Sequence, residues 1–235
     1  MRGHALFPLL LVLAACTPAP RAPAPVAAPP ALDEAGYRAA ARAGRVVYRI
    51  APGQGGAWVV VRRGGPLASL GHDHVVASRG LEGYVLWPAD GTPGRADIRV
   101  DLRELEVDPA DLRQEAGLDG TLDAEAVLGT ARNMHDKVLD SHRFPYLVLR
   151  LRGVMEPAGG TVEGRLTLHG VTRPVALEVE AVREREVLRL AGRFRLRQSD
   201  FGITPFSVLG GALRVRNGLE GRFTVVARPW PGASR

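Results

Sequence analysis

The strongest constraint on the fold is a period-two alternation of apolar and polar residues that recurs along most of the chain. Successive side chains of a β-strand point to opposite faces, so this pattern predicts strands with one buried and one solvated face. The clearest inward rows are Ile98, Val100 and Leu102; Leu147, Leu149 and Leu151; Leu166 and Leu168; and Leu188, Leu190 and Phe194. Weaker alternation covers residues 46–50, 58–62, 75–79, 81–87, 175–181 and 223–227. Together the runs predict eight to ten strands.

Short connections between these runs, such as Gly170 to Pro174, indicate antiparallel neighbours. One clear helical pattern interrupts them over about Asp123 to Asp140, with Val127, Met134 and Val138 on one face. A single helix cannot cover both faces of a parallel sheet, which excludes the doubly wound α/β class. A sandwich and a closed barrel of about eight strands remain.

The first residues are typical of an export signal. An apolar run over residues 5–15 follows Arg2 and is too short to span a bilayer as a helix. Its end, Leu13-Ala14-Ala15-Cys16, resembles the lipobox of bacterial lipoproteins, whose cysteine is acylated. We predict a lipoprotein signal peptide over residues 1–15 and a lipidated Cys16 that attaches the chain to a membrane; the alternative is an ordinary signal followed by a free cysteine. Acylation implies an exported protein of the periplasm or cell envelope.

Thr17, rather than aspartate, follows that cysteine and favours the outer membrane in a host with two membranes. Six prolines from Pro18 to Pro30 then predict a semi-rigid spacer, and fifteen such residues span roughly 45 Å. An Ala-rich stretch from Asp33 to Gly44 predicts a short helix. We divide the chain into a signal (1–15), a lipidated cysteine with linker and helical lead-in (16–44) and one barrel domain (45–230).

The basic charge of the chain is weak evidence for nucleic-acid binding. The formal net charge is +6, and Lys137 is the only lysine among the 31 basic residues. The arginines are spread evenly, without the interleaved aromatic residues of a single-strand binding surface. We therefore expect no nucleic-acid partner. A single cysteine also excludes an intramolecular disulfide.

One segment carries a family resemblance. Residues 164–175 read GRLTLHGVTRPV and resemble the strand-turn-strand signature of the YceI-like family. Arg143-Phe144-Pro145 and Ser199-Asp200-Phe201-Gly202-Ile203 resemble two further family segments in the right order, over residues 45 to 228. The resemblance implies an all-β fold, an antiparallel lipocalin-like β-barrel of about eight strands with one helix inserted mid-domain.

The family resemblance also implies a non-catalytic function, the binding of an isoprenoid or other long amphiphilic lipid in the barrel. The lining is then expected from the inward rows given above, since apolar contact contributes about 0.8 kcal/mol per buried methylene. On composition alone the same rows favour a barrel filled by its own side chains, and the family resemblance reverses that preference. No other cofactor is expected.

His72 and His74 depart from the usual family pattern. They are two residues apart, so in an extended chain both imidazoles lie on one face, with Asp73 on the other. They are candidates for contact with a ligand headgroup at the barrel mouth. The alternative is a metal-dependent enzyme or metal carrier, which needs a third ligand from His135, His142 or His169. We expect His135 and His142 to be exposed beside the helix. A structural envelope module is the third hypothesis.

Overall fold

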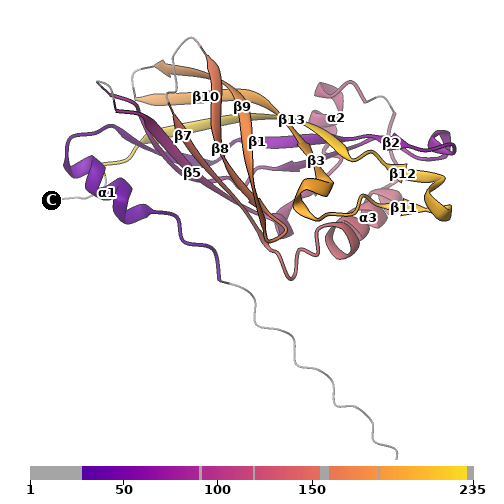
Figure 1. Cartoon of the computed structure of the whole chain (residues 1–235). Coiled ribbons are helices and arrows are strands. Elements are labelled where there is room, and N and C mark those ends of the chain that lie inside the picture. Colours follow the sequence, from indigo (N-terminus) through magenta and orange to yellow (C-terminus); the bar gives the residue numbers. More distant parts are fainter. Residues whose placement is uncertain (1–27, 90–91, 119, 154–158, 185, 232–235) are drawn as a thin grey trace, which may run out of the picture.

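The computed structural model describes residues 28–89, 92–118, 120–153, 159–184 and 186–231, in which eight antiparallel strands close into a barrel (Figure 1). The barrel strands are β1 (Val47–Val61), β4 (Glu82–Leu86), β5 (Gly94–Asp101), β7 (Tyr146–Gly153), β8 (Gly160–Leu168), β9 (Val171–Glu184), β10 (Val187–Arg197) and β13 (Gly218–Pro229). They follow the order β13-β10-β9-β8-β7-β5-β4-β1, and β1 pairs with β13 to close the ring. The predicted all-β barrel with a mid-domain helix is confirmed.

Strand β1 closes the barrel along its whole length. Tyr48 pairs with Pro229 at one end of the β1–β13 ladder and Val60 with Glu220 at the other. The register shifts between Ile50 and Gly55, which marks a bulge. The two strands predicted over 46–50 and 58–62 are therefore one long bulged strand, because the loss of alternation at the bulge does not end the pairing.

The other edge of β1 changes partner. Residues 47–49 pair with β4, whereas residues 57–61 pair with β3 (His74–Ser78), which in turn pairs with β6 (Glu106–Val107). At this end the wall therefore continues through β3 and β6 instead of β4. A separate sheet of three short strands, β2 (Arg63–Gly64), β11 (Ser207–Val208) and β12 (Leu213–Val215), lies at the same end (Figure 1).

Helices occupy both ends of the barrel. Helix α1 (Glu34–Arg42) lies within the predicted helical lead-in, and Asp33 accepts the Gly36 N–H at its start. Its Tyr37 is fully buried against Tyr84 of β4, with ring centroids 5.2 Å apart. Helix α3 (Ala124–Asn133) continues through a π-helical turn over Met134–Val138, within the predicted span, and lies at the opposite end from α1 (Figure 1).

Short helical segments complete the described structure. Helix α2 (Ala110–Glu115), which was not predicted, packs Leu112 on the outer side of the wall against Trp58 and Val75. The remaining 3-10 turns are η1 (Ala68–Leu70), η2 (Leu102–Glu104), η4 (Gln198–Phe201) and η5 (Leu209–Gly211). None of the helices within the described ranges is long and apolar enough to cross a bilayer. The predicted signal and Cys16 lie outside those ranges.

The inward rows do not pack uniformly along the barrel. In the half nearer α1 they form a filled core of side chains that includes Val85, Ile98, Leu151, Leu188 and Leu190. In the half nearer α3, inward side chains of β1 and β3 such as Val59 and Val76 are only half-buried. The barrel is thus packed in one half and hollow in the other.

Candidate functional site

An apolar cavity of about 330 Å³ lies in the barrel half that α3 covers. Inward residues of β1 and β3 form one wall, and residues of β5, β7 and β8 form the facing wall. The helical segment contributes Met134 and Val138, and the small sheet contributes Leu213 and Val215. The volume is within the range of about 300–1,000 Å³ that is typical of small-molecule sites.

Two phenylalanines set the boundary between the hollow and the packed half. Phe194 of β10 lies opposite Gly221 of β13, and Phe223 of β13 lies opposite Gly192 of β10. An added Cβ at Gly221 would come within 2.2 Å of the Phe194 ring, and one at Gly192 within 2.6 Å of the Phe223 ring. Each ring therefore lies over a glycine of the neighbouring strand. Both rings pack against the core, and Phe194 also lines the cavity.

Polar groups gather at the rim of the cavity. His72 and His74 line it together, while Asp73 turns away and accepts hydrogen bonds from Arg62 Nη1 and the Arg63 N–H, each at 2.8 Å. Thr130 and Gln198 add neutral polar groups. The arrangement has the form of an amphiphile site, apolar inside with a few polar groups at its entrance.

His74 is held by a buried carboxylate. Its Nδ1 lies 2.6 Å from Asp108 Oδ2, and Asp108 Oδ1 accepts from the Val75 N–H at 2.9 Å and from Arg113 Nη1 at 2.7 Å. Desolvation alone would raise the pKa of Asp108, but these three hydrogen bonds outweigh it and hold the pKa below its usual value. Because a carboxylate only accepts, the hydrogen of this contact lies on Nδ1 of His74, and Nε2 is the second ring nitrogen.

The residues predicted to line a ligand divide into two groups. The cavity is lined by Val100, Leu102, Leu147, Leu168 and Phe194. The others belong to or pack against the side-chain clusters of the core, namely Ile98, Leu149, Leu151, Leu166, Leu188 and Leu190. The alternation shows that a residue points inward but not where it lies along the barrel axis. Both groups therefore look alike in the sequence.

Several lining residues were not predicted from the sequence. Val59 and Val61 come from a weakly alternating run, and Met134 and Val138 come from the helix face that was predicted without a role. The helical spacing of that face was the available signal. Phe206 lies in an irregular segment, where no periodicity marks it.

The other histidines do not join His72 and His74. His135 is half-buried with Nδ1 3.1 Å from Ser141 Oγ, so the expectation of an exposed side chain was wrong. Burial lowers the pKa of His135. His169 occupies the turn between β8 and β9 with φ of 52° and packs against Phe144, with ring centroids 4.3 Å apart. Across the described residues, no group of three His, Cys, Asp or Glu side chains is arranged to hold a metal ion.

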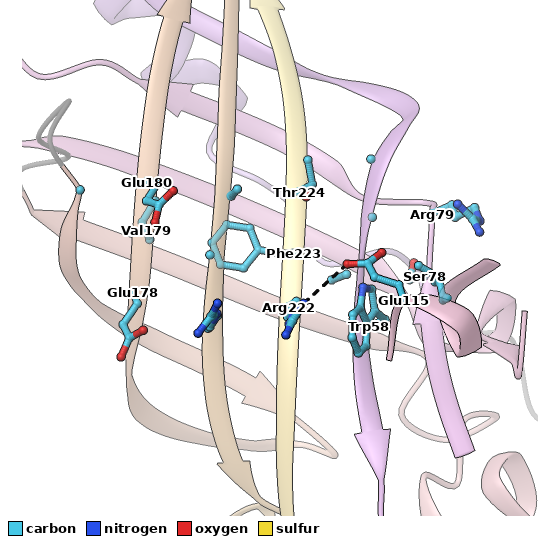
Figure 2. Close-up of a pocket in the computed structure, with 18 of the residues that line it drawn as sticks. Trp58, Ser78, Arg79, Glu115, Glu178, Val179, Glu180, Arg222, Phe223 and Thr224 are labelled. Atoms are coloured by element: carbon cyan, nitrogen blue, oxygen red, sulfur yellow. Dashed lines mark ion pairs between the residues drawn. The ribbon is translucent and has the colours of Figure 1, made fainter. Parts of the chain in front are cut away.

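A larger hollow of about 890 Å³ lies on the outer face and has a different character (Figure 2). Figure 2 shows Glu178 and Glu180 on β9, Arg222 on β13 and Glu115 on α2 around it, with Arg222 and Glu115 joined by an ion pair of 3.9 Å. Further charged, exposed side chains around it are those of Arg79, Asp111 and Arg193. An apolar molecule would be desolvated far less here than in the inner cavity.

Comparisons with known proteins agree with this architecture. The family model for the YceI-like domain matches residues 77–225. The structure is similar to that of BcnA from Burkholderia cenocepacia, with a TM-score of 0.56 and 15% identity over 75% of this chain and 98% of that chain. No curated protein matches the sequence.

Two further solved structures are similar. A polyisoprenoid binding domain from Saccharophagus degradans, implicated in plant cell wall breakdown, has a TM-score of 0.50 and 12% identity over 78% of this chain and 98% of that chain. A YceI protein from Campylobacter jejuni has a TM-score of 0.46 and 12% identity over 65% and 83% of the two chains. The likeness to BcnA and to the Saccharophagus degradans domain, at 15% and 12% identity, shows the fold alone.

Proposed function

Because this chain belongs to the YceI-like domain family, we propose that it binds an isoprenoid or another long amphiphilic lipid inside its barrel and catalyses no reaction. The observation that carries the proposal is the inner cavity, whose walls are lined predominantly by apolar side chains with a few polar groups among them. The similar domain from Saccharophagus degradans, described as polyisoprenoid binding, supports the same ligand class.

The size of the cavity defines how much of a lipid it holds. At about 30 Å³ for each methylene-sized group, the share of one water molecule in the liquid, 330 Å³ accommodates about ten such groups. Their burial contributes roughly 8 kcal/mol before the costs of binding. A longer chain extends past the rim or displaces the Phe194 ring at the inner end.

The headgroup of the lipid lies, in this proposal, at His72 and His74. In the tautomer with its hydrogen on Nδ1, His74 can accept a hydroxyl or amide hydrogen of the ligand at Nε2. His72 is exposed and stays free to adjust to headgroups of different size.

Mass spectrometry of the full chain extracted from cells tests the binding proposal. The chain is purified in a detergent that is distinguishable by mass, and lipids are extracted and quantified against protein. We expect about one molecule of one amphiphilic lipid per protein chain. The amount should fall in His74→Ala and in a variant whose cavity is filled by a larger side chain. A chain without any co-purifying lipid, and without uptake of added geranylgeraniol or palmitate, would contradict the proposal.

We also propose that the chain is an exported lipoprotein that is attached to the cell envelope through acylated Cys16. In a host with two membranes, we propose the outer membrane as its location. The lipobox-like sequence and the proline-rich spacer support this proposal. Growth with an alkyne fatty acid should label the wild-type chain, and the Cys16→Ser variant should take up no label. Equal labelling of the two chains would overturn the anchor while leaving the lipid-binding proposal intact.

A further inference from the structure

Exposed apolar side chains collect at the end of the molecule where the cavity opens. Within the described ranges, seven large hydrophobic residues are exposed, and four of them lie on two neighbouring turns. These four residues are Leu67, Leu70, Val208 and Leu209, and we call the surface that they form the mouth tip. Leu70 and Leu209 expose 68% and 67% of their surface. Single exposed hydrophobic residues are ordinary, but such a group marks an interaction surface.

The two turns of the mouth tip form one unit. The Leu67 N–H donates to the Ala212 carbonyl at 2.9 Å, and β2 pairs with β12 through Arg63 and Val215. In Figure 1 these turns project at the end opposite α1, next to α3. The same segments supply Arg63, Leu213 and Val215 to the cavity lining, so the mouth tip is continuous with the cavity rim.

Positive charge surrounds the mouth tip. Residues 62–74 and 203–217 contain four arginines and a single acidic residue, Asp73. That carboxylate is already engaged by Arg62 and by the Arg63 N–H. Arg214 and Arg216 are exposed. A group of exposed apolar side chains among arginines is complementary to an anionic lipid surface.

The N-terminal lead-in runs toward the same end. The Pro30 carbonyl accepts from Arg99 Nη1 at 2.9 Å, and Asp33 Oδ2 accepts from Arg95 Nη1 at 2.7 Å. Going back toward the N-terminus, the chain thus follows β5 from Arg95 to Arg99, and the next inward residue, Val100, lines the cavity. The described part of the lead-in, from Asp33 back to Pro30, therefore runs along β5 toward the end of the barrel that carries the mouth tip.

We propose that the mouth tip docks on an anionic bilayer, with its four apolar side chains at the acyl boundary and the arginines at the lipid phosphates. The cavity rim then faces the membrane, and a lipid passes between bilayer and cavity without crossing water. This transfer rests on the proposed lipid-binding function, whereas the docking itself does not. A second copy of the chain on the same surface is the competing occupant.

Site-specific fluorescence in the full chain tests the docking. The Cys16→Ser background removes the single native cysteine, and Leu209→Cys then carries one environment-sensitive nitrobenzoxadiazole label. The matched control carries the label at Val182→Cys, an exposed apolar position at the far end of β9. Vesicles contain phosphatidylcholine with 30% phosphatidylglycerol and a phosphatidylcholine spin-labelled on its acyl chain as quencher. Any attachment through the N-terminal segment acts equally on both labelled chains.

We expect vesicles to quench the label at position 209 and to leave the label at position 182 unquenched. Arg214→Gln should weaken the vesicle affinity about fivefold, because one arginine near an anionic surface contributes that factor. Arg193→Gln on the outer face of β10 should leave the affinity unchanged. Equal quenching at both positions, or none at 209, overturns the docking. If, without vesicles, the fluorescence of the label at position 209 reports an increasingly apolar environment as the protein concentration rises, the surface binds a second copy of the chain. That result also overturns the docking on a bilayer.

Lipid content, measured by mass spectrometry on the same preparations, separates the two proposals. Bound lipid without quenching at position 209 leaves the binding function and removes the docking surface. Quenching at position 209 in a chain that holds and takes up no lipid leaves the docking and removes the transfer.

Discussion

His74 Nδ1 lies 2.6 Å from Asp108 Oδ2, which joins the rim of the cavity to a buried carboxylate 34 residues further along the chain. Asp108 has a left-handed backbone, with φ of 57°, directly after β6, and its second oxygen is shared by Arg113 and the Val75 N–H. The ring position of His74 is thus fixed by the same contacts that hold β3 to the segment before α2. The ligand contact proposed for His74 and the local stability therefore both depend on the Asp108 side chain.

Replacing Asp108 should therefore destabilise the whole domain. Asp108→Asn keeps the shape and the tolerance for a left-handed backbone, but it removes the carboxylate charge that faces the buried Arg113 guanidinium. We expect a loss of about 3 kcal/mol in the free energy of unfolding, measured by urea denaturation. Asp111→Asn removes an exposed carboxylate that is paired with Arg79 and should cost much less, because solvent screens that pair. Similar losses for the two variants would contradict this account.

The same carboxylate should give the protein a specific acid sensitivity. The pKa of Asp108 is lower in the folded chain than in the unfolded chain, so the unfolded chain binds the proton first as the pH falls. This contribution to stability is complete above about pH 4, the unfolded pKa, and is lost as the pH falls through the folded pKa. The free energy of unfolding of Asp108→Asn should fall less steeply than that of the wild type below pH 4. Parallel pH profiles would assign the acid response to other carboxylates.

Filling the cavity should remove the ligand without unfolding the barrel. Val76 points into the cavity and is half-buried, so Val76→Phe places a ring where a lipid tail would lie. We expect the co-purified lipid to fall to less than half of the wild-type amount. Val182→Phe makes the same change on an exposed position of β9 and should retain the lipid. Melting temperatures of the two variants show whether a loss of lipid reflects a loss of fold.

The glycines beneath the phenylalanine rings should differ in their response to alanine. An added Cβ at Gly192 would lie 1.9 Å from the Glu178 carbonyl oxygen, so Gly192→Ala forces β9 and β10 apart and should cost about 2–3 kcal/mol. At Gly221 the close neighbour is the Phe194 ring, which moves into the cavity and reduces its volume. Gly221→Ala should therefore lose bound lipid with a smaller loss of stability, and Gly218→Ala, with open space around it, should change neither. Unfolding curves and lipid content, measured together, distinguish the three variants.

Much of the fold follows from local pattern. The alternating rows predicted the barrel strands because each strand has one face in the core. The Ala-rich stretch from Asp33 to Gly44 predicted α1 because helix propensity is a local property. Helix α2 was missed because its six residues are too few to show a helical period. The bulge that joins residues 46–50 to residues 58–62 arises from the pairing of β1 with β13. The local sequence of β1 holds no information about that partner.

The candidate site was only partly predictable, for the same reason. The spacing of His72 and His74 indicates a shared face, which follows from strand geometry alone. The Asp108 partner of His74 comes from a distant turn, and its role depends on how β3 and β6 pair. Which inward leucines line a cavity and which fill a core is decided by the change of partner along β1. That change is a property of the assembled sheet.

The pairing of β1 with β13 also governs how the chain acquires its structure. Tyr48 of β1 pairs with Pro229 of β13, so the barrel cannot close until nearly the whole domain has been synthesised. Contacts this distant in sequence form slowly, and until then β1 and the last strand already in place present open edges. Loss of the last strand would leave two such edges in a finished chain, with the cavity open along its length. The barrel is therefore completed by its C-terminal strand, and a chain cut short before residue 218 should aggregate instead of folding into a smaller barrel.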